Sequence, residues 1–225
     1  MSEEEDLTKD IFGWTGTVIS FFFYIAPVVP YLKLIKGEKT LQESPGVLLI
    51  CSLLNCILWS DYALIGDKFQ VYFANGIGAC ITLIFVSIYL IYLAKKNLLL
   101  SCVYITFLIL CVIELYFICY YVISDEVTGI IANIFNVLMY AAPGEKMYTV
   151  CKTGNYQLIP IWSTIGALAC STSWMLYGFY LGDIMIIIPN VLGMISAVVQ
   201  VAVFLVFKGK DKKKEISPNE EHVES

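Results

Sequence analysis

The sequence predicts an all-α membrane protein whose seven transmembrane helices form two parallel three-helix repeats joined by a linker helix, in a 3+1+3 order. Three observations support this fold class. Hydrophobic residues make up 59% of the chain and charged residues only 15%, whereas an ordinary soluble domain has about 25% charged residues. Seven apolar stretches are each long enough to cross a hydrocarbon layer about 30 Å thick. Five residues also recur at one constant separation in the two halves of the chain.

The seven apolar stretches follow one another with short intervening segments that carry charged residues or glycine. They run over 11–32, 45–65, 70–94, 98–123, 127–148, 158–181 and 184–207. Such unbroken runs favour helices over the short alternating strands of a membrane barrel.

These stretches divide the chain into five segments. They are an extracellular or lumenal N-terminal tail at 1–10, a first three-helix repeat at 11–94, a linker helix at 98–123, a second three-helix repeat at 127–207 and a cytosolic tail at 208–225. We expect the C-terminal tail to be disordered, because it begins basic, ends acidic and has no apolar periodicity.

The internal repeat is visible as a set of five matching residues. Pro45, Trp59, Tyr62, Asn75 and Gly78 recur as Pro160, Trp174, Tyr177, Asn190 and Gly193, and every pair is 115 residues apart (160 − 45 through 193 − 78). The first three spans therefore match the last three, with the fourth left as a linker. Because an even number of spans separates the starts of the copies, both copies have the same orientation in the membrane. A parallel repeat with polar residues at matching places is typical of a transporter whose site lies between the copies.

The distribution of lysine predicts the orientation in the membrane. All 14 basic residues are lysines, and only Lys9 and Lys68 fall on the side of the membrane opposite the other twelve. Since cytoplasmic loops collect positive charge, the N-terminus is expected outside or in a lumen and the C-terminus in the cytosol. The protein is thus expected to be a multi-pass integral protein of the plasma membrane or an intracellular membrane. The acidic start has no signal-peptide n-region, so the first span is expected to be retained.

Asn75 and Asn190 lie near the middle of their spans, where an unpaired amide would cost several kcal/mol against hydrocarbon. An interhelical hydrogen bond worth about 0.6 to 2 kcal/mol is one explanation. However, each amide follows a tryptophan, Trp59 or Trp174, by 16 residues (75 − 59 and 190 − 174), which favours a shared polar cavity. Indole faces stack on the CH faces of a sugar ring, and amides both donate to and accept from its hydroxyls. The alternative for the tryptophans is the aromatic belt at the membrane surface.

Other residues add to this predicted site. Asn55 precedes Trp59 by four residues and shares its helix face, and Cys170 holds the matching place before Trp174. Four prolines lie near the cytosolic ends of spans and are candidate hinges, because each removes a backbone donor: Pro27, Pro45, Pro143 and Pro160. Pro45 and Pro160 also suit the first turn of a helix, where no hydrogen bond is lost.

Segments 45–78 and 160–193 resemble the two repeats of the SWEET family of sugar transporters, above all in WMLYG at 174–178 and PNVLG at 189–193. The resemblance covers nearly the whole chain except the tails. It implies a central substrate site formed by Trp59, Asn75, Trp174 and Asn190, and positions that influence sugar size at Phe23, Asn55, Met139 and Cys170. It also implies hinges at Pro27, Pro45, Pro143 and Pro160, and gate residues at Tyr62, Tyr177 and Asp183.

The resemblance further implies bidirectional uniport of a sugar by alternating access, without a cofactor, metal or nucleic acid. In the family, bulky residues at the size-determining positions go with monosaccharides, so glucose is an expected substrate. Membrane lipids are the other expected partner, with about 1 kcal/mol for each lysine of the basic segment 208–214 near anionic lipid. A homo-oligomer remains open.

Two other functions remain to be weighed. A seven-helix receptor would have the same orientation, but the internal repeat counts against it. A proton-coupled transporter of small solutes would use an intramembrane acid, for which Asp61 and Glu114 are the candidates. An intramembrane enzyme is not expected, since the only histidine, His222, lies in the tail and no catalytic arrangement of Ser and His occurs.

Overall fold

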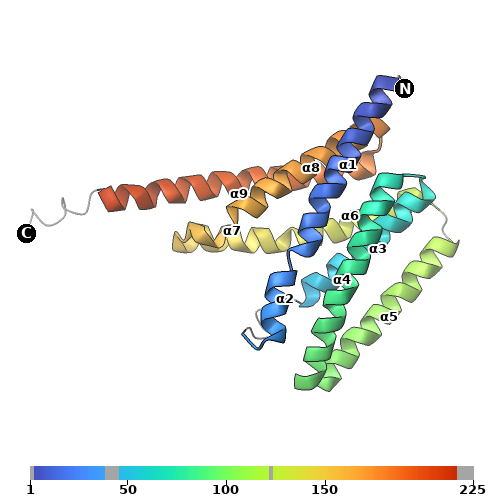
Figure 1. Cartoon of the computed structure of the whole chain (residues 1–225), viewed down its shortest axis with the longest axis horizontal. Coiled ribbons are helices and arrows are strands. Elements are labelled where there is room, and N and C mark those ends of the chain that lie inside the picture. The colour runs from blue at the N-terminus through green and yellow to red at the C-terminus, as the bar shows by residue number, and fades with distance from the viewer. Residues whose placement is uncertain (1–2, 39–45, 122–123, 217–225) are drawn as a thin grey trace, which may run out of the picture.

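The computed structural model describes residues 3–38, 46–121 and 124–216, and the regular structure in these residues is helical. The helices are α1 (Glu3–Ile25), α2 (Val28–Ile35), α3 (Gly46–Ile65), α4 (Phe69–Lys96), α5 (Leu98–Tyr121), α6 (Asp125–Met139), α7 (Ala141–Thr153), the short 3₁₀ helix η2 (Tyr156–Leu158), α8 (Ile161–Leu181) and α9 (Ile184–Ile216). Figure 1 shows the arrangement.

These helices make the seven spans predicted from the sequence. Five segments are long and apolar enough to cross a membrane: Glu3–Ile35, Leu48–Ile65, Phe69–Lys96, Asp125–Thr153 and Ile184–Lys210. Helices α5 and α8 complete the set, with 24 and 21 residues against the roughly 20 that a span requires. The expectation of seven helices is confirmed.

Six of the spans form a closed ring. Helix α4 packs between α1 and α3 in the first repeat, and α9 packs between α6 and α8 in the second. The repeats meet twice, where α1 contacts α8 and where α3 contacts α6. Helix α5 lies outside the ring against α4 and α3. Side chains on several faces of α5, such as Val103, Ile109 and Val112, are exposed, as suits a linker surrounded by lipid. The 3+1+3 order is confirmed.

The first span of each repeat is broken, where the sequence predicted continuous stretches. Helix α1 ends at Ile25, and Pro27 stands immediately before α2. Likewise α6 ends at Met139, and Tyr140 joins it to α7, which carries Pro143 in its first turn. A proline inside a helix removes one donor and its ring displaces the preceding turn, which explains both breaks.

The two outermost helices extend into the segments expected to be tails. Helix α1 begins at Glu3, and its first turn holds four acidic residues, which stabilise the positive N-terminal end of a helix. Helix α9 continues to Ile216, beyond the start of the tail expected to be disordered at residue 208. It ends shortly before Pro218, a residue that disfavours helix in the position before it.

The ring has two distinct ends, named here by their charges. The ion-pair end carries Asp10, Lys68, Asp125 and Asp183, and the lysine-rich end carries Lys33, Lys95, Lys152 and Lys208. In Figure 1 the helices meet near the N-terminus at the ion-pair end. Toward the lysine-rich end they diverge, with α7 and α9 pointing to one side and α2 and α5 to another.

Candidate functional site

A cavity lies in the centre of the ring. Its empty space is about 600 Å³, counted with the solvent that enters its open side. The lining side chains come from the six ring spans, while α5 contributes none of them. They are Ser20, Tyr24, Asn55, Trp59, Val71, Asn75, Asn136, Tyr140, Trp174, Ile186, Pro189 and Asn190. None of these side chains is charged, so the cavity suits a neutral polar solute.

Most of the lining residues are related by the internal repeat. Three pairs are separated by 115 residues (174 − 59, 190 − 75 and 186 − 71), and two pairs on the first span of each repeat are separated by 116 (136 − 20 and 140 − 24). The cavity therefore lies on the pseudo-twofold axis between the repeats, as expected for a site in a parallel-repeat transporter.

The two central amides are held in the same way. Asn75 Nδ2 donates to Val71 O at 2.9 Å, and Asn190 Nδ2 donates to Ile186 O at 2.7 Å. Their carbonyl oxygens differ, because Asn75 Oδ1 accepts from the Tyr24 hydroxyl at 3.3 Å, whereas no described residue donates to Asn190 Oδ1. The second amide thus offers a free acceptor to a solute.

The two indoles are buried inside the ring. Trp59 is 6% and Trp174 9% exposed, and each meets a tyrosine three residues later edge to face, with ring centroids 5.3 Å apart for Trp59 and Tyr62 and 5.5 Å apart for Trp174 and Tyr177. Trp174 Nε1 also donates to Ser20 Oγ at 3.1 Å. These indoles line the cavity and do not belong to a lipid-facing aromatic belt.

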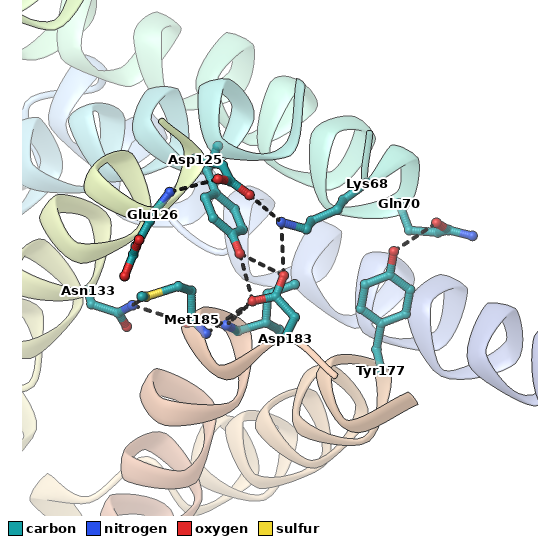
Figure 2. A network of polar contacts seen from close by, with 10 residues as sticks. Lys68, Gln70, Asp125, Glu126, Asn133, Tyr177, Asp183 and Met185 are labelled. Carbon is teal, nitrogen blue, oxygen red and sulfur yellow. Dashed lines mark hydrogen bonds and ion pairs between the residues drawn. The ribbon is translucent and has the colours of Figure 1, made fainter. Parts of the chain in front are cut away.

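A polar network joins the repeats at the ion-pair end. The Tyr62 hydroxyl donates to the Asp183 carboxylate, 2.6 Å from both oxygens. Lys68 Nζ lies 3.0 Å from Asp183 Oδ2, 3.6 Å from Asp125 Oδ2 and 3.8 Å from the centre of the Tyr62 ring. Figure 2 shows Lys68 between the two carboxylates. Because Lys68 and Tyr62 come from the first repeat and both acids from the second, these contacts close this end of the cavity.

The second tyrosine makes a matching contact across the repeats. The Tyr177 hydroxyl donates to Gln70 Oε1 at 3.1 Å, and Gln70 Nε2 donates to Asp10 Oδ1 at 2.9 Å. In Figure 2 Tyr177 and Gln70 lie beside Lys68 and Asp183. Tyr62 and Tyr177 therefore each bond to a residue of the other repeat.

Glycines on the first spans make room for these tyrosines. A Cβ atom on Gly129 would lie 2.9 Å from the Tyr62 ring, and one on Gly13 would lie 2.9 Å from the Tyr177 ring. These two glycines are 116 residues apart (129 − 13). A methyl group at either position would push a tyrosine away from its partner across the repeats.

The repeated glycines Gly78 and Gly193 serve a second pair of tyrosines. A Cβ on Gly78 would overlap the ring of Tyr24, and one on Gly193 would lie 2.8 Å from the Tyr140 hydroxyl. Tyr24 and Tyr140 both line the cavity. This close approach gives a physical reason for glycine at the fifth position of the repeat.

The structure brings five of the eight predicted substrate-site residues into the cavity lining: Trp59, Asn75, Trp174, Asn190 and Asn55. Asn55 Oδ1 is buried and has no hydrogen-bond partner among the described residues. Three predicted residues, Phe23, Met139 and Cys170, are half-buried and are not among the lining residues. Cys170 Sγ lies 3.4 Å from Ser20 Oγ, and the ring of Phe23 packs near Gly166.

The predicted hinge and gate residues divide into groups. Pro27 and Pro143 lie at the breaks in the first spans, whereas Pro160 directly precedes α8 and its carbonyl accepts from Thr164 N, so it costs no helical hydrogen bond. Pro45 and the side chain of Glu114 lie outside the described residues. Tyr62 and Asp183 bond to each other, and Tyr177 bonds to Gln70.

Several site residues were missed by sequence reasoning. Four residues of the first spans line the cavity without having been predicted: Ser20, Tyr24, Asn136 and Tyr140. The sequence pattern that could have found them is a second constant separation, of 116 residues, which also relates Pro27 to Pro143. One extra residue between the first and second spans of the first repeat hides this signal. Lys68 was missed at the gate, although it lies 115 residues before Asp183 (183 − 68) with the opposite charge. In the described residues, no cluster of His, Cys, Asp and Glu could hold a metal ion.

Comparisons with known proteins agree with this architecture. A family model described as "Sugar efflux transporter for intercellular exchange" matches residues 10–97 and 126–212, the two repeats. Bidirectional sugar transporter SWEET1 of Arabidopsis thaliana is 30% identical, with 93% of this chain and 87% of the relative covered. Bidirectional sugar transporter SWEET1a of Sorghum bicolor is 31% identical, with 91% of this chain and 78% of the relative covered.

A solved structure shows the same fold. The structure of a eukaryotic SWEET transporter at 3.7 Å resolution superposes with a TM-score of 0.84, covering 92% of this chain and 100% of that chain at 21% identity. Since the family model matches both halves of the ring and the relatives extend over nearly the full length, the chain belongs to the SWEET family of transporters, which are not enzymes.

Proposed function

We propose that this protein is a bidirectional facilitative sugar transporter that works as a uniporter by alternating access, with a monosaccharide such as glucose as its substrate. The observation that carries the proposal is the repeat-related set of Trp59, Asn75, Trp174 and Asn190 around one uncharged central cavity. Membership of the SWEET family and the names of the relatives, which are bidirectional sugar transporters, support the same function.

The cavity has the chemistry that a neutral sugar requires. The indoles of Trp59 and Trp174 offer apolar faces to the CH groups of a ring, and the free Asn190 Oδ1 accepts from a hydroxyl. Asn55 adds a further amide to the lining, on the same helix as Trp59. A charged solute would lose its hydration in this cavity without meeting an opposite charge.

Access alternates between the two ends of the ring. The contacts of Tyr62 and Lys68 with Asp183 close the ion-pair end, while the helices diverge at the lysine-rich end. Release on the opposite side requires these contacts to break and the lysine-rich ends to approach each other. The breaks beside Pro27 and Pro143 are the hinges for this movement. Tyr177 and Gln70 form a second contact that opens with the gate.

The contacts of the closed gate stabilise it only moderately, so the gate can open. Lys68 and Asp183 have side chains only 12% and 9% exposed, so their pairing costs desolvation that the Coulomb attraction must offset. The Tyr62 hydroxyl and the Met185 N–H also bond to Asp183, which satisfies the carboxylate in the closed state. Water replaces these partners when the gate opens, so the two states differ by only a few kcal/mol.

The lysine-rich end faces the cytosol and the N-terminus lies outside or in a lumen. The distribution of the 14 lysines supports this orientation, because positive residues collect on the cytosolic side. In this orientation the closed gate of Tyr62, Lys68 and Asp183 lies on the side opposite the cytosol.

The function is tested with purified protein in liposomes and radiolabelled glucose. Uptake is expected to reach equilibrium with no ion gradient, and liposomes preloaded with unlabelled glucose are expected to take up label transiently by counterflow. Fructose and sucrose in parallel assays report on the size of the preferred sugar. Uptake that requires a proton gradient would contradict uniport, and no flux of any sugar would contradict the proposed function.

A further inference from the structure

Pro189 disturbs helix α9 at the wall of the cavity. Helix α9 contains this one proline among its described residues, directly before Asn190. Proline has no backbone N–H, so the carbonyl of Met185, four residues earlier, loses its helical donor. An unsatisfied carbonyl is costly in the interior of a membrane protein, and a neighbouring helix has to supply a partner.

Asn133 on α6 supplies that partner. Its Nδ2 lies 3.1 Å from Met185 O and 2.9 Å from Gly129 O in its own helix. Figure 2 shows the side chain of Asn133 directed at Met185. Both partners are carbonyl oxygens, so the amide nitrogen has to face them. This leaves Asn133 Oδ1 buried with no partner among the described residues, which indicates that the amide is kept for its donor.

The first repeat shows what happens without the proline. Thr17 matches Asn133 (133 − 17 = 116), and Ala74 matches Pro189 (189 − 74 = 115). Ala74 has a backbone N–H, so α4 has no carbonyl freed by proline at this place. Thr17 Oγ1 donates instead to Gly13 O of its own helix, at 2.8 Å. The donor between helices thus occurs in the repeat that has the proline.

We propose that Asn133 is a positioning residue that fixes the turn of α9 around Pro189 and thereby aims Asn190 into the cavity. Asn133 does not line the cavity itself, but the turn that it holds carries Asn190, whose Nδ2 donates to Ile186 O. The Tyr140 hydroxyl holds the same turn from the cavity side by donating to Pro189 O at 2.7 Å. This inference rests on the proposed function in taking Asn190 as a sugar ligand.

The test is a double-mutant cycle with Pro189. Asn133→Leu keeps the side-chain size and removes the donor, so the half-saturation concentration for glucose is expected to rise at least about fivefold at equal protein in the liposome. Pro189→Ala restores the backbone donor to Met185 O. In that background, Asn133→Leu is expected to change half-saturation less than about twofold. Thr17→Val, the matched control in the first repeat, is expected to change it less than about twofold.

A second readout does not depend on transport. In detergent, Asn133→Leu is expected to lower the melting temperature by several degrees in the wild-type background and by less than about one degree in the Pro189→Ala background. If the wild type carries no sugar, the proposed function fails while this comparison still tests the contact. The inference would be overturned if Asn133→Leu lowered the melting temperature equally in the wild-type and Pro189→Ala backgrounds. It would also be overturned if the melting temperatures differed as expected but Asn133→Leu left the half-saturation concentration for glucose unchanged.

If Pro189→Ala transports no glucose, Asn133→Gln is compared with Asn133→Leu in the wild-type background instead. Glutamine retains an amide donor, so its half-saturation concentration is expected to lie closer to wild type than that of Asn133→Leu. Equal half-saturation for these two variants would overturn the positioning role.

Discussion

Lys68 and Asp183 occupy matching places in the two repeats, 115 residues apart, and their charged groups meet at 3.0 Å across the ion-pair end. Two copies of one sequence would place like charges at these positions, and like charges this close repel. Opposite charges let the copies pair with each other. Asp125 matches Lys9 in the same way (125 − 9 = 116), so the two copies carry opposite charges at both places.

The first prediction concerns this ion pair. Lys68→Asp brings its carboxylate toward those of Asp125 and Asp183, and breaking a buried pair costs about 3 to 5 kcal/mol. Glucose flux of this variant is expected to fall at least about tenfold, because the closed state is lost. The double variant Lys68→Asp with Asp183→Lys restores opposite charges and is expected to regain part of the flux. A double variant no better than Lys68→Asp alone would show that the pair is not what closes this end.

The second prediction concerns the space between the repeats. Gly129→Ala places a methyl group 2.9 Å from the Tyr62 ring and displaces the tyrosine from Asp183. Such overpacking typically costs about 1 to 3 kcal/mol, so both melting temperature and flux are expected to fall. Gly76→Ala is the matched control, since nothing lies within 4 Å of a Cβ there, and alanine favours a helix by up to about 1 kcal/mol. Equal losses in the two variants would remove the steric argument.

The third prediction concerns the break in the first span. Pro27→Ala returns a backbone donor and allows α1 and α2 to join into one straight helix. The maximal rate of glucose flux is expected to fall several-fold. Pro27→Gly keeps a weak point, because glycine costs about 1 kcal/mol relative to alanine in a helix, and it is expected to retain more of the rate than Pro27→Ala. Helix content by circular dichroism, compared with the flux, separates straightening from misfolding.

The fold could be predicted from the sequence because the membrane constrains each helix by itself, whatever the other helices do. Long apolar stretches have to form helices in a membrane, and an amide in mid-span has to face protein or water. Those constraints led from Asn75 and Asn190 to the central cavity, and from the separation of 115 residues to the 3+1+3 order. Five predicted residues line the cavity for this reason.

The contacts between the helices were harder to predict. Each one joins residues from distant parts of the chain, and for most of them no sequence spacing links the two partners. Asn133 donates to the carbonyl that Pro189, on another helix, leaves without its helical donor, and no sequence spacing relates these two residues. Gln70 lies in the first turn of α4, and Asp10 lies in the segment that the sequence assigns to the N-terminal tail. Polar residues are common at both places, so their pairing with Tyr177 leaves no pattern in the sequence. Phe23 and Met139 are apolar, and spacing alone does not separate a residue that lines a cavity from one that does not.

The most direct test of the central claim is glucose counterflow by liposomes containing Asn190→Ala or Trp174→Ala, compared with Trp162→Ala. Trp162 lies on the same helix as Trp174 but is 83% exposed, so it controls for loss of an indole. The two cavity variants are expected to lose at least about 90% of counterflow, a change of 1.4 kcal/mol or more, with protein amount and melting temperature near wild type, while Trp162→Ala transports normally. Normal counterflow by both cavity variants would contradict the assignment of the substrate to this cavity.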